Sequence, residues 1–326
     1  MKIDIIKYKY IKYIILNIYK IGGVTANIKE RYTLEQFNKV PEHLEIIEDI
    51  FIQKPEDEQW LLSKLDLSEQ EVDEIESGEM IPDKIQLENI YNFAYNSGLF
   101  LNEIEWQDKL DEFRGNSTVV ATHGSRTNIK GDIRVDVSGE SNDFGNGFYI
   151  GEDIAQAGMW VGEEPNSSLY ILTFDEEGLQ KAQFNVSVDW MLAVCYYRNQ
   201  IPEYSNSERI IAIKEKVDNC DYVYAPIADN KLFEVIDAFV AEEITDLQCL
   251  YALSATHLGY QYVLKTERAL ENLNIIDHLY FSSVEKSLYN KESDVENNTS
   301  LHKAFIAKKR YKDQGKYISE LLGDKE

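Results

Sequence analysis

Two short apolar runs, each bordering a glycine turn, constrain the fold of this chain more than any other feature. The run Val119–Thr122 is typical of a buried strand, and it ends abruptly in His-Gly-Ser at residues 123–125. Later in the chain, Asp-Phe-Gly-Asn-Gly-Phe-Tyr-Ile at residues 143–150 places a glycine turn before a second apolar run. Residues 153–160 then have the small and apolar spacing of a packed helix. A histidine at one strand end and a tyrosine after a glycine turn would converge if the strands are neighbours, which predicts a site on a rigid scaffold.

The length and charge of the chain bound its organisation. With 326 residues, it is long enough for about two domains of ordinary size, each with its own core. A hydrophobic content of 44% is typical of a folded chain rather than a disordered one. The formal net charge of -25 repels phosphate backbones over most of the surface, so bulk binding to nucleic acid is not expected.

Cysteine and histidine usage argues against disulfide and metal sites. The three cysteines, Cys195, Cys220 and Cys249, have no close-spaced pair, which predicts neither a disulfide framework nor a zinc knuckle. The five histidines show no spacing typical of metal ligands, so we expect no metal site. A chain without disulfides fits a reducing compartment, and we expect a cytoplasmic location.

The first 32 residues are predicted to form an N-terminal extension. They are rich in Ile and Tyr, and lysines interrupt them from residue 2 to residue 20. The longest uncharged run, Tyr13–Tyr19, is far shorter than the roughly 20 residues of a membrane span, and no small-residue cleavage site follows it. We therefore expect no membrane attachment. Residues 1–32 could form an amphipathic strand or helix docked on the body, or a poorly ordered extension.

The next region, residues 33–114, is predicted to be an acidic domain built only from helices. It holds little glycine and many Glu, Leu and Ile residues. Pro41 and Pro55 divide its first half into helices near 42–53 and 56–65.

Two further helices continue this domain. Ser68 and Glu71 have the spacing of a capping box, and a longer helix is expected over residues 83–95. Part of this stretch resembles the second half of a helix-turn-helix domain of the phage-repressor type. The resemblance is carried by Ile75, Glu76, Gly78, Pro82, Leu87, Ile90 and Tyr91.

This region departs from DNA-binding proteins at the surface that would read the duplex. Such a surface needs Lys, Arg, Gln or Asn to meet phosphates and base edges. Here it carries Glu69, Glu71, Asp73, Glu74 and Glu76, so direct DNA binding is not expected. Two interpretations stay open: the domain docks an antitoxin, a regulator or another basic partner, or it is a solvated helical unit that braces the next domain.

Composition changes at residue 115, where an α+β domain is predicted to begin and to extend to residue 283. Strands are expected at 118–122, 147–151, 168–174, 222–226 and 260–265. Helices are expected near 153–161, 189–198, 231–241 and 246–256. This irregular interleaving favours a mixed or antiparallel sheet over a doubly wound fold. Residues 284–326 are predicted to form a polar linker, at 291–300, and a basic C-terminal helix over 303–316.

Three segments resemble, in their order, motifs of the ADP-ribosyltransferase superfamily. They are His-Gly-Ser at 123–125, Gly-Asn-Gly-Phe-Tyr at 145–149 and Ala-Gly-Met-Trp at 157–160. They are most similar to the histidine–tyrosine–acid branch, which includes the diphtheria-toxin-like and poly-ADP-ribosyl enzymes. Segments 221–230 and 261–270 look like those of an uncharacterised bacterial, toxin-like subfamily. The resemblance implies an ADP-ribosyltransferase-like split β-sheet domain and NAD as co-substrate.

The resemblance also implies roles for particular residues. His123 would hydrogen-bond a ribose hydroxyl of the adenosine half of NAD, and the main chain of Gly124 would grip the nicotinamide amide. Tyr149 and Trp160 would sandwich the cationic nicotinamide ring, because a desolvated cation on an aromatic face gains up to about 2 kcal/mol. Ser125 would add a hydroxyl contact.

The third motif departs from the family, because the position of its usual glutamate falls on Gln261. A glutamine can hydrogen-bond the ribose, but it offers no full negative charge to the oxocarbenium-like state through which the glycosidic bond breaks. Three interpretations follow. Gln261 suffices for transfer to a strong nucleophile, Glu267 or another carboxylate substitutes for it, or the domain binds NAD without turnover. Since elongation into poly-ADP-ribose relies on that glutamate, mono-ADP-ribosyl transfer is the expected reaction.

These observations lead to three functional hypotheses. The first is an NAD-dependent mono-ADP-ribosyltransferase, a bacterial toxin or phage-defence enzyme, that modifies a protein or nucleic-acid acceptor and uses His123, Tyr149 and Gln261 as catalytic residues. The second is a non-catalytic NAD-binding sensor or protein-interaction module, which Gln261 motivates. The third is an NAD glycohydrolase, which would produce ADP-ribose without labelling a macromolecule.

Overall fold

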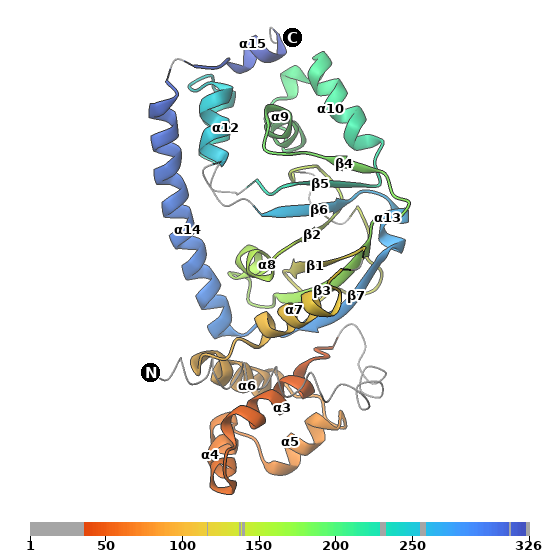
Figure 1. The fold of residues 1–326 in the computed structure, drawn as a ribbon, viewed down its shortest axis with the longest axis vertical. Coiled ribbons are helices and arrows are strands. Elements are labelled where there is room, and N and C mark those ends of the chain that lie inside the picture. Colours follow the sequence, from red (N-terminus) through yellow and green to blue (C-terminus); the bar gives the residue numbers. More distant parts are fainter. Residues whose placement is uncertain are drawn as a thin grey trace.

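The computed structural model describes residues 36–323, apart from residues 116, 137, 139–140, 229–232, 255–258 and 313. The predicted N-terminal extension, residues 1–32, lies outside the described residues. A helical part is followed by a part built around one sheet, which confirms the α+β class with a helical N-terminal region (Figure 1). None of the described helices combines the length and the apolar character that crossing a bilayer would require.

Local capping explains where the helices of the N-terminal part begin. These helices are α3 (Val40–Phe51), α4 (Pro55–Leu65), α5 (Glu69–Glu76), α6 (Lys84–Asn96) and α7 (Leu101–Glu112). The predicted capping box is confirmed, since the Ser68 N–H donates to Glu71 Oε2 at 2.8 Å and Ser68 Oγ accepts from the Glu71 N–H at 3.2 Å. Asp83 and Gln86 make the same exchange at the start of α6. The helices share an apolar core that includes Leu44, Ile47, Leu61, Leu65, Ile75 and Ile90.

The second part contains a seven-stranded sheet in the order β4-β5-β6-β2-β1-β3-β7. Its strands are β1 (Thr118–Ser125), β2 (Phe148–Gly151), β3 (Ser168–Asp175), β4 (Lys181–Gln183), β5 (Tyr222–Pro226), β6 (Tyr260–Leu264) and β7 (Leu273–Leu279). Neighbours are antiparallel except for β4 and β5, which confirms the mixed or antiparallel sheet and the five predicted strands. Strand β4 is too short to leave a periodic signal, and polar Asn274, Asp277 and His278 interrupt the apolar pattern of β7.

The sheet bends so that its two halves contact each other. Phe174 on β3 and Tyr222 on β5 have ring centroids 5.1 Å apart, although three strands separate them in the sheet order. Tyr262 on β6 also meets Phe174, with centroids 6.0 Å apart. The bend encloses a core on the inner face of the sheet, to which Ile129 and Ile133 contribute from the loop after β1.

Helices cover the outer face of the sheet in two groups (Figure 1). Helix α8 (Ile154–Val161) packs on β1 and β3, in a core that also holds Trp106 of α7 and Tyr289 of α14. The helices α9 (Val188–Tyr197), α10 (Glu208–Asp218), α11 (Phe233–Val240) and α12 (Asp246–Ser254) build the core over β4, β5 and β6. The short helix α13 (Glu267–Glu271) joins β6 to β7.

The C-terminal region differs from the prediction. A single helix, α14 (Ser283–Arg310), runs from α6 past α8 to α12, so the predicted linker at 291–300 is helical (Figure 1). That stretch contains neither proline nor glycine, and its charged residues are adequate helix formers, so nothing local ends the helix. Of the predicted basic helix over 303–316, the part up to Arg310 belongs to α14, and the next helix, α15 (Ile318–Leu322), begins after the predicted range.

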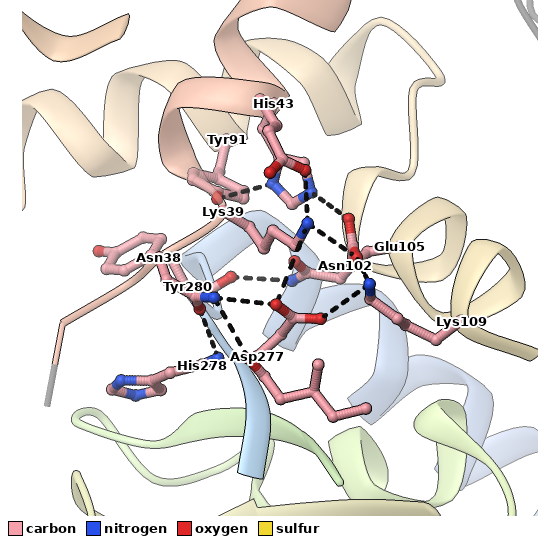
Figure 2. A network of polar contacts seen from close by, with 12 residues as sticks. Asn38, Lys39, His43, Tyr91, Asn102, Glu105, Lys109, Asp277, His278 and Tyr280 are labelled. Atoms are coloured by element: carbon pink, nitrogen blue, oxygen red, sulfur yellow. Dashed lines mark hydrogen bonds and ion pairs between the residues drawn. The ribbon is translucent and has the colours of Figure 1, made fainter. Parts of the chain in front are cut away.

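A buried polar network joins the helical part to β7 (Figure 2). Asn38 Nδ2 donates to Asp277 Oδ1 at 2.8 Å. Asp277 is fully buried, and Lys39 Nζ and Lys109 Nζ each lie 4.0 Å from one of its oxygens. Glu105 lies between the two lysines, 3.1 Å from Lys39 Nζ and 3.7 Å from Lys109 Nζ. Charges from both parts of the chain therefore hold the helices against the edge of the sheet.

Candidate functional site

The candidate site lies where the sheet splits between β1 and β2. Strand β1 is in register with β3 over eight residue pairs, and β2 is in register with β6 over four. Between β1 and β2 the register holds one pair, Thr122 opposite Gly151. The last residues of β1, 123–125, therefore lack a complete ladder on the β2 side, and side chains at this split can reach across it.

His123 bridges the split. Its Nδ1 lies 2.7 Å from the main-chain oxygen of Tyr149, and its ring stacks on Phe148 with centroids 4.5 Å apart. Because a carbonyl oxygen only accepts, Nδ1 carries the proton. Burial lowers the pKa of His123 below its usual 6.5, against the opposing effect of the Tyr149 carbonyl, so the ring is neutral at pH 7. Nε2 has no hydrogen-bond partner among the described residues, and it is not enclosed by the protein. It therefore faces solvent as a hydrogen-bond acceptor.

Tyr149 fixes the glycine turn that precedes it. Its hydroxyl donates to Gly145 O at 2.7 Å and accepts from the Phe144 N–H at 3.1 Å. Gly145 has a φ of 70°, which favours glycine, and Lys265 Nζ donates to Phe144 O at 2.6 Å. Burial, with the nearby Asp143 carboxylate, raises the pKa of Tyr149, so its hydroxyl stays protonated. The half-buried Tyr149 ring is therefore held on the outer face of the sheet, whereas the His123 ring lies on the inner face with Phe148.

Gly124 allows α8 to approach β1. A Cβ atom at this position would lie 2.4 Å from the main-chain oxygen of Ala157 and 3.1 Å from Val161 Cγ2. No real Cβ comes so close to a main-chain oxygen, so any side chain here would push α8 away from the strand. The structure thus supplies a packing reason for this glycine, while its predicted grip on nicotinamide stays a prediction.

We expect Gly124→Ala to lower the free energy of unfolding by about 1–3 kcal/mol, the usual cost of overpacking. Gly151→Ala is the matched control, because a Cβ on this neighbouring strand has Thr122 Oγ1 as its nearest atom, at 3.9 Å. Denaturant unfolding of both variants measures the difference. Equal losses of stability would contradict the close approach of α8 to Gly124.

The other predicted contact residues flank this centre. Ser125 ends β1 opposite Ser168 of β3 and is half-buried. Trp160 is on α8, and 56% of its surface is exposed. No ring contact joins Trp160 to Tyr149 in the described chain, so their sandwich around a ligand stays a prediction. Glu267, the alternative carboxylate, is exposed in the first turn of α13, beyond the end of β6.

Gln261 belongs to a buried polar cluster on the outer face of the sheet. Its Nε2 donates to Asp143 Oδ2 at 2.8 Å and approaches Pro226 O at 3.4 Å. Asp143 also accepts from the Ala228 N–H at 3.0 Å and forms an ion pair with Arg198. Gln261, Asp143 and the Arg198 side chain each expose less than a tenth of their surface.

The three predicted catalytic residues lie on three neighbouring strands. His123 is on β1, Tyr149 on β2 and Gln261 on β6, with Tyr149 in the middle. Tyr149 and Gln261 share the outer face, because Gly151 is opposite Gln261 and side chains alternate along a strand. Sequence reasoning missed Asp143 and Arg198. Asp143 opens the glycine turn, but Arg198 gives no local signal because its partners are distant in the chain.

Comparison with known families adds one finding. Residues 120–275 match the model of a family described as a protein of unknown function (DUF3990). The matched segment contains the split between β1 and β2 and all three predicted catalytic residues. No curated protein and no solved structure matches the chain. The resemblance to ADP-ribosyltransferases therefore rests on the sequence motifs.

Proposed function

We propose that this chain is an NAD-dependent mono-ADP-ribosyltransferase acting on a macromolecular acceptor, as a bacterial toxin or defence enzyme. The observation that carries the proposal is the placement of His123, Tyr149 and Gln261 on three neighbouring strands at the split of the sheet, with Tyr149 and Gln261 on its outer face and His123 on its inner face. The family resemblance assigns these positions to the two riboses and the nicotinamide of NAD. Gln261 is more than a hundred residues from the other two in the sequence, so the adjacency of its strand to that of Tyr149 is not a local effect.

The hydrogen-bonding character of the site suits a ribose. A ribose presents hydroxyl groups that need acceptors, and the neutral His123 ring offers Nε2 because Nδ1 is held by the Tyr149 carbonyl. A neutral acceptor also leaves the cationic nicotinamide unopposed by a second positive charge. The exposed face of Trp160 provides an aromatic surface for that cation.

The reaction would be a displacement at C1′ of the nicotinamide ribose. The bond from C1′ to the ring nitrogen breaks, and nicotinamide leaves as a neutral molecule with the electron pair. The acceptor atom forms the new bond to C1′ and loses its proton to water or a nearby base. Gln261 cannot act as a general base, so the acceptor must attack C1′ without one. This favours transfer of a single ADP-ribose unit over chain elongation.

The test is nicotinamide release from labelled NAD in the presence of cell lysate. Wild type should release nicotinamide and label a macromolecule. His123→Ala and Tyr149→Ala should each lower the rate of nicotinamide release about 10- to 100-fold. A loss of this size corresponds to one lost interaction with the charged transition state. Binding of NAD by both variants, followed by calorimetry, separates lost turnover from lost affinity. A wild-type protein that is folded but neither binds NAD nor releases nicotinamide would contradict the proposal.

Two alternatives give different outcomes of the same experiment. Release of ADP-ribose equal to release of nicotinamide, with no labelled macromolecule, would indicate an NAD glycohydrolase. Binding of NAD without release would indicate a sensor, a possibility favoured by the ion pair that neutralises Asp143 near Gln261.

The docking of an antitoxin or regulator belongs to the same proposal, because α5 exposes Glu69 and Asp73. Docking that survives charge reversal of these two residues would contradict that assignment.

A further inference from the structure

The amide of Gln261 has one orientation that its surroundings allow. Its Nε2 faces Asp143 Oδ2 at 2.8 Å and Pro226 O at 3.4 Å, on the interior side. Both neighbours are acceptors, so the NH2 group must face them and the amide oxygen must face away. In the described chain Oε1 has no hydrogen-bond partner, and it is not enclosed by the protein. It therefore belongs to the 6% of the Gln261 surface that is exposed.

Asp143 is itself immobilised by three groups. Arg198 pairs with Oδ1, whereas Oδ2 accepts from the Ala228 N–H at 3.0 Å and from Gln261. Trp190 Nε1 donates to Pro226 O at 3.0 Å, which also fixes the second acceptor that faces the amide. The arrangement is rigid, since each contact comes from a different segment of the chain.

We propose that Asp143 is a positioning residue that orients Gln261, so that Gln261 Oε1 accepts a hydrogen bond from a ribose hydroxyl of NAD. This inference rests on the proposed function. It assigns the carboxylate of the site to Asp143. This residue lies behind Gln261, the position at which the ADP-ribosyltransferases that the chain resembles carry their glutamate. The ligand-facing atom is then a neutral oxygen, and the negative charge behind it is balanced by Arg198.

The inference makes Gln261→Glu a harmful change in this chain. A glutamate at this position would place its carboxylate against Asp143, at the 2.8 Å now occupied by an N–H···O bond. Two carboxylates at that distance repel each other unless one takes up a proton. Restoring the residue that the family resemblance expects would therefore disorder the site.

Asp143→Asn is expected to reverse the orientation instead. The charged Arg198 holds the amide oxygen more strongly than the Ala228 N–H does, so the new amide places its NH2 toward Gln261 and gives up the hydrogen bond from Ala228. Gln261 would then turn its own oxygen inward and present NH2 to the ligand. In the double variant Asp143→Asn/Gln261→Glu, the asparagine NH2 donates to the glutamate, and an acceptor oxygen faces the ligand again.

The experiment measures nicotinamide release, with kcat and KM separated, for wild type, both single variants and the double variant. Each single variant should lose about 10- to 100-fold in kcat/KM, and the double variant should recover most of that loss. Release by Gln261→Glu should also rise as the pH falls, because protonation of one carboxyl removes the repulsion. Glu152→Gln is the matched control, since Glu152 follows Gly151 and its carboxylate contacts the Tyr224 hydroxyl at 2.9 Å. This control should keep wild-type release.

The outcomes separate this inference from the proposed function. A wild type that releases nicotinamide, together with a Gln261→Glu variant at least as active as wild type, would overturn the orienting role of Asp143 and leave the function intact. Additive losses in the double variant would overturn it equally. A folded wild type that does not bind NAD would overturn both. Unfolding curves of all variants exclude loss of fold as the cause of low release.

Discussion

Replacing Lys39 by methionine should lower the free energy of unfolding by about 3–5 kcal/mol, the cost of leaving a buried charge without its partner. Lys39 is buried, and its Nζ lies 3.1 Å from Glu105 and 4.0 Å from the fully buried Asp277. These carboxylates raise the pKa of Lys39 although its burial acts in the opposite direction. Methionine keeps the length of the side chain, so the change removes mainly charge.

The matched control is Lys54→Met. Lys54 also pairs with a carboxylate, at 3.9 Å from Glu56, but the two side chains are 67% and 71% exposed. An exposed pair of this kind contributes about 0–1 kcal/mol, so this variant should unfold close to wild type. Asp277→Asn added to Lys39→Met should recover part of the loss, because it removes one of the uncompensated charges. Equal stability of the two lysine variants in denaturant would show that the network of Figure 2 does not hold the helical part in place.

Glu285, at the start of α14, should make the protein less stable as the pH rises from about 5 to 8. This carboxyl is fully buried, and burial raises its pKa from 4.5 to about 8, with hydrogen bonds from Tyr95 and Asn102 opposing the shift. The folded state therefore holds a proton that the unfolded state releases above pH 4.5. The stabilisation from this proton is complete below pH 4.5 and is lost as the pH rises through 8.

Glu285→Gln isolates this contribution. Glutamine keeps an oxygen for Asn102 Nδ2, which now donates to Glu285 Oε2 at 2.9 Å, and its NH2 faces the Tyr95 hydroxyl. The stability of wild type relative to this variant should fall by up to about 1.4 kcal/mol for each pH unit between 5 and 8. Urea unfolding at several pH values measures the slope.

Glu88→Gln, on the neighbouring α6, supplies a control of opposite sign. Hydrogen bonds from Ser283 and Tyr280 lower the pKa of Glu88, although burial favours its protonated form. Its contribution to stability is therefore present above pH 4.5 and is lost as the pH falls further. A pH-independent difference between wild type and Glu285→Gln would show that Glu285 is not held in a protonated state.

Local features of the sequence predicted much of this architecture. The capping box of Ser68 and Glu71, the helix starts at Pro41 and Pro55, and five of the strands were all predictable because each depends on residues within a few positions of one another. The sequence also placed His123, Tyr149 and Gln261 on strands, but it left open whether those strands are neighbours. These features follow from backbone conformation and hydrophobic alternation, which a short window of sequence contains.

Only the tertiary structure decided which side chains meet. Asn38 and Asp277 are 239 residues apart, and Gln261 is 118 residues from Asp143, so no local pattern could pair them. The predicted linker within α14 was wrong for the same reason, because helices α8 and α12 support a stretch that looks polar by itself. The sequence by itself determined most of the helices and five of the strands, because these depend on local patterns. The tertiary structure determined the orientation of the site residues, since buried polar groups must find partners wherever the fold brings them.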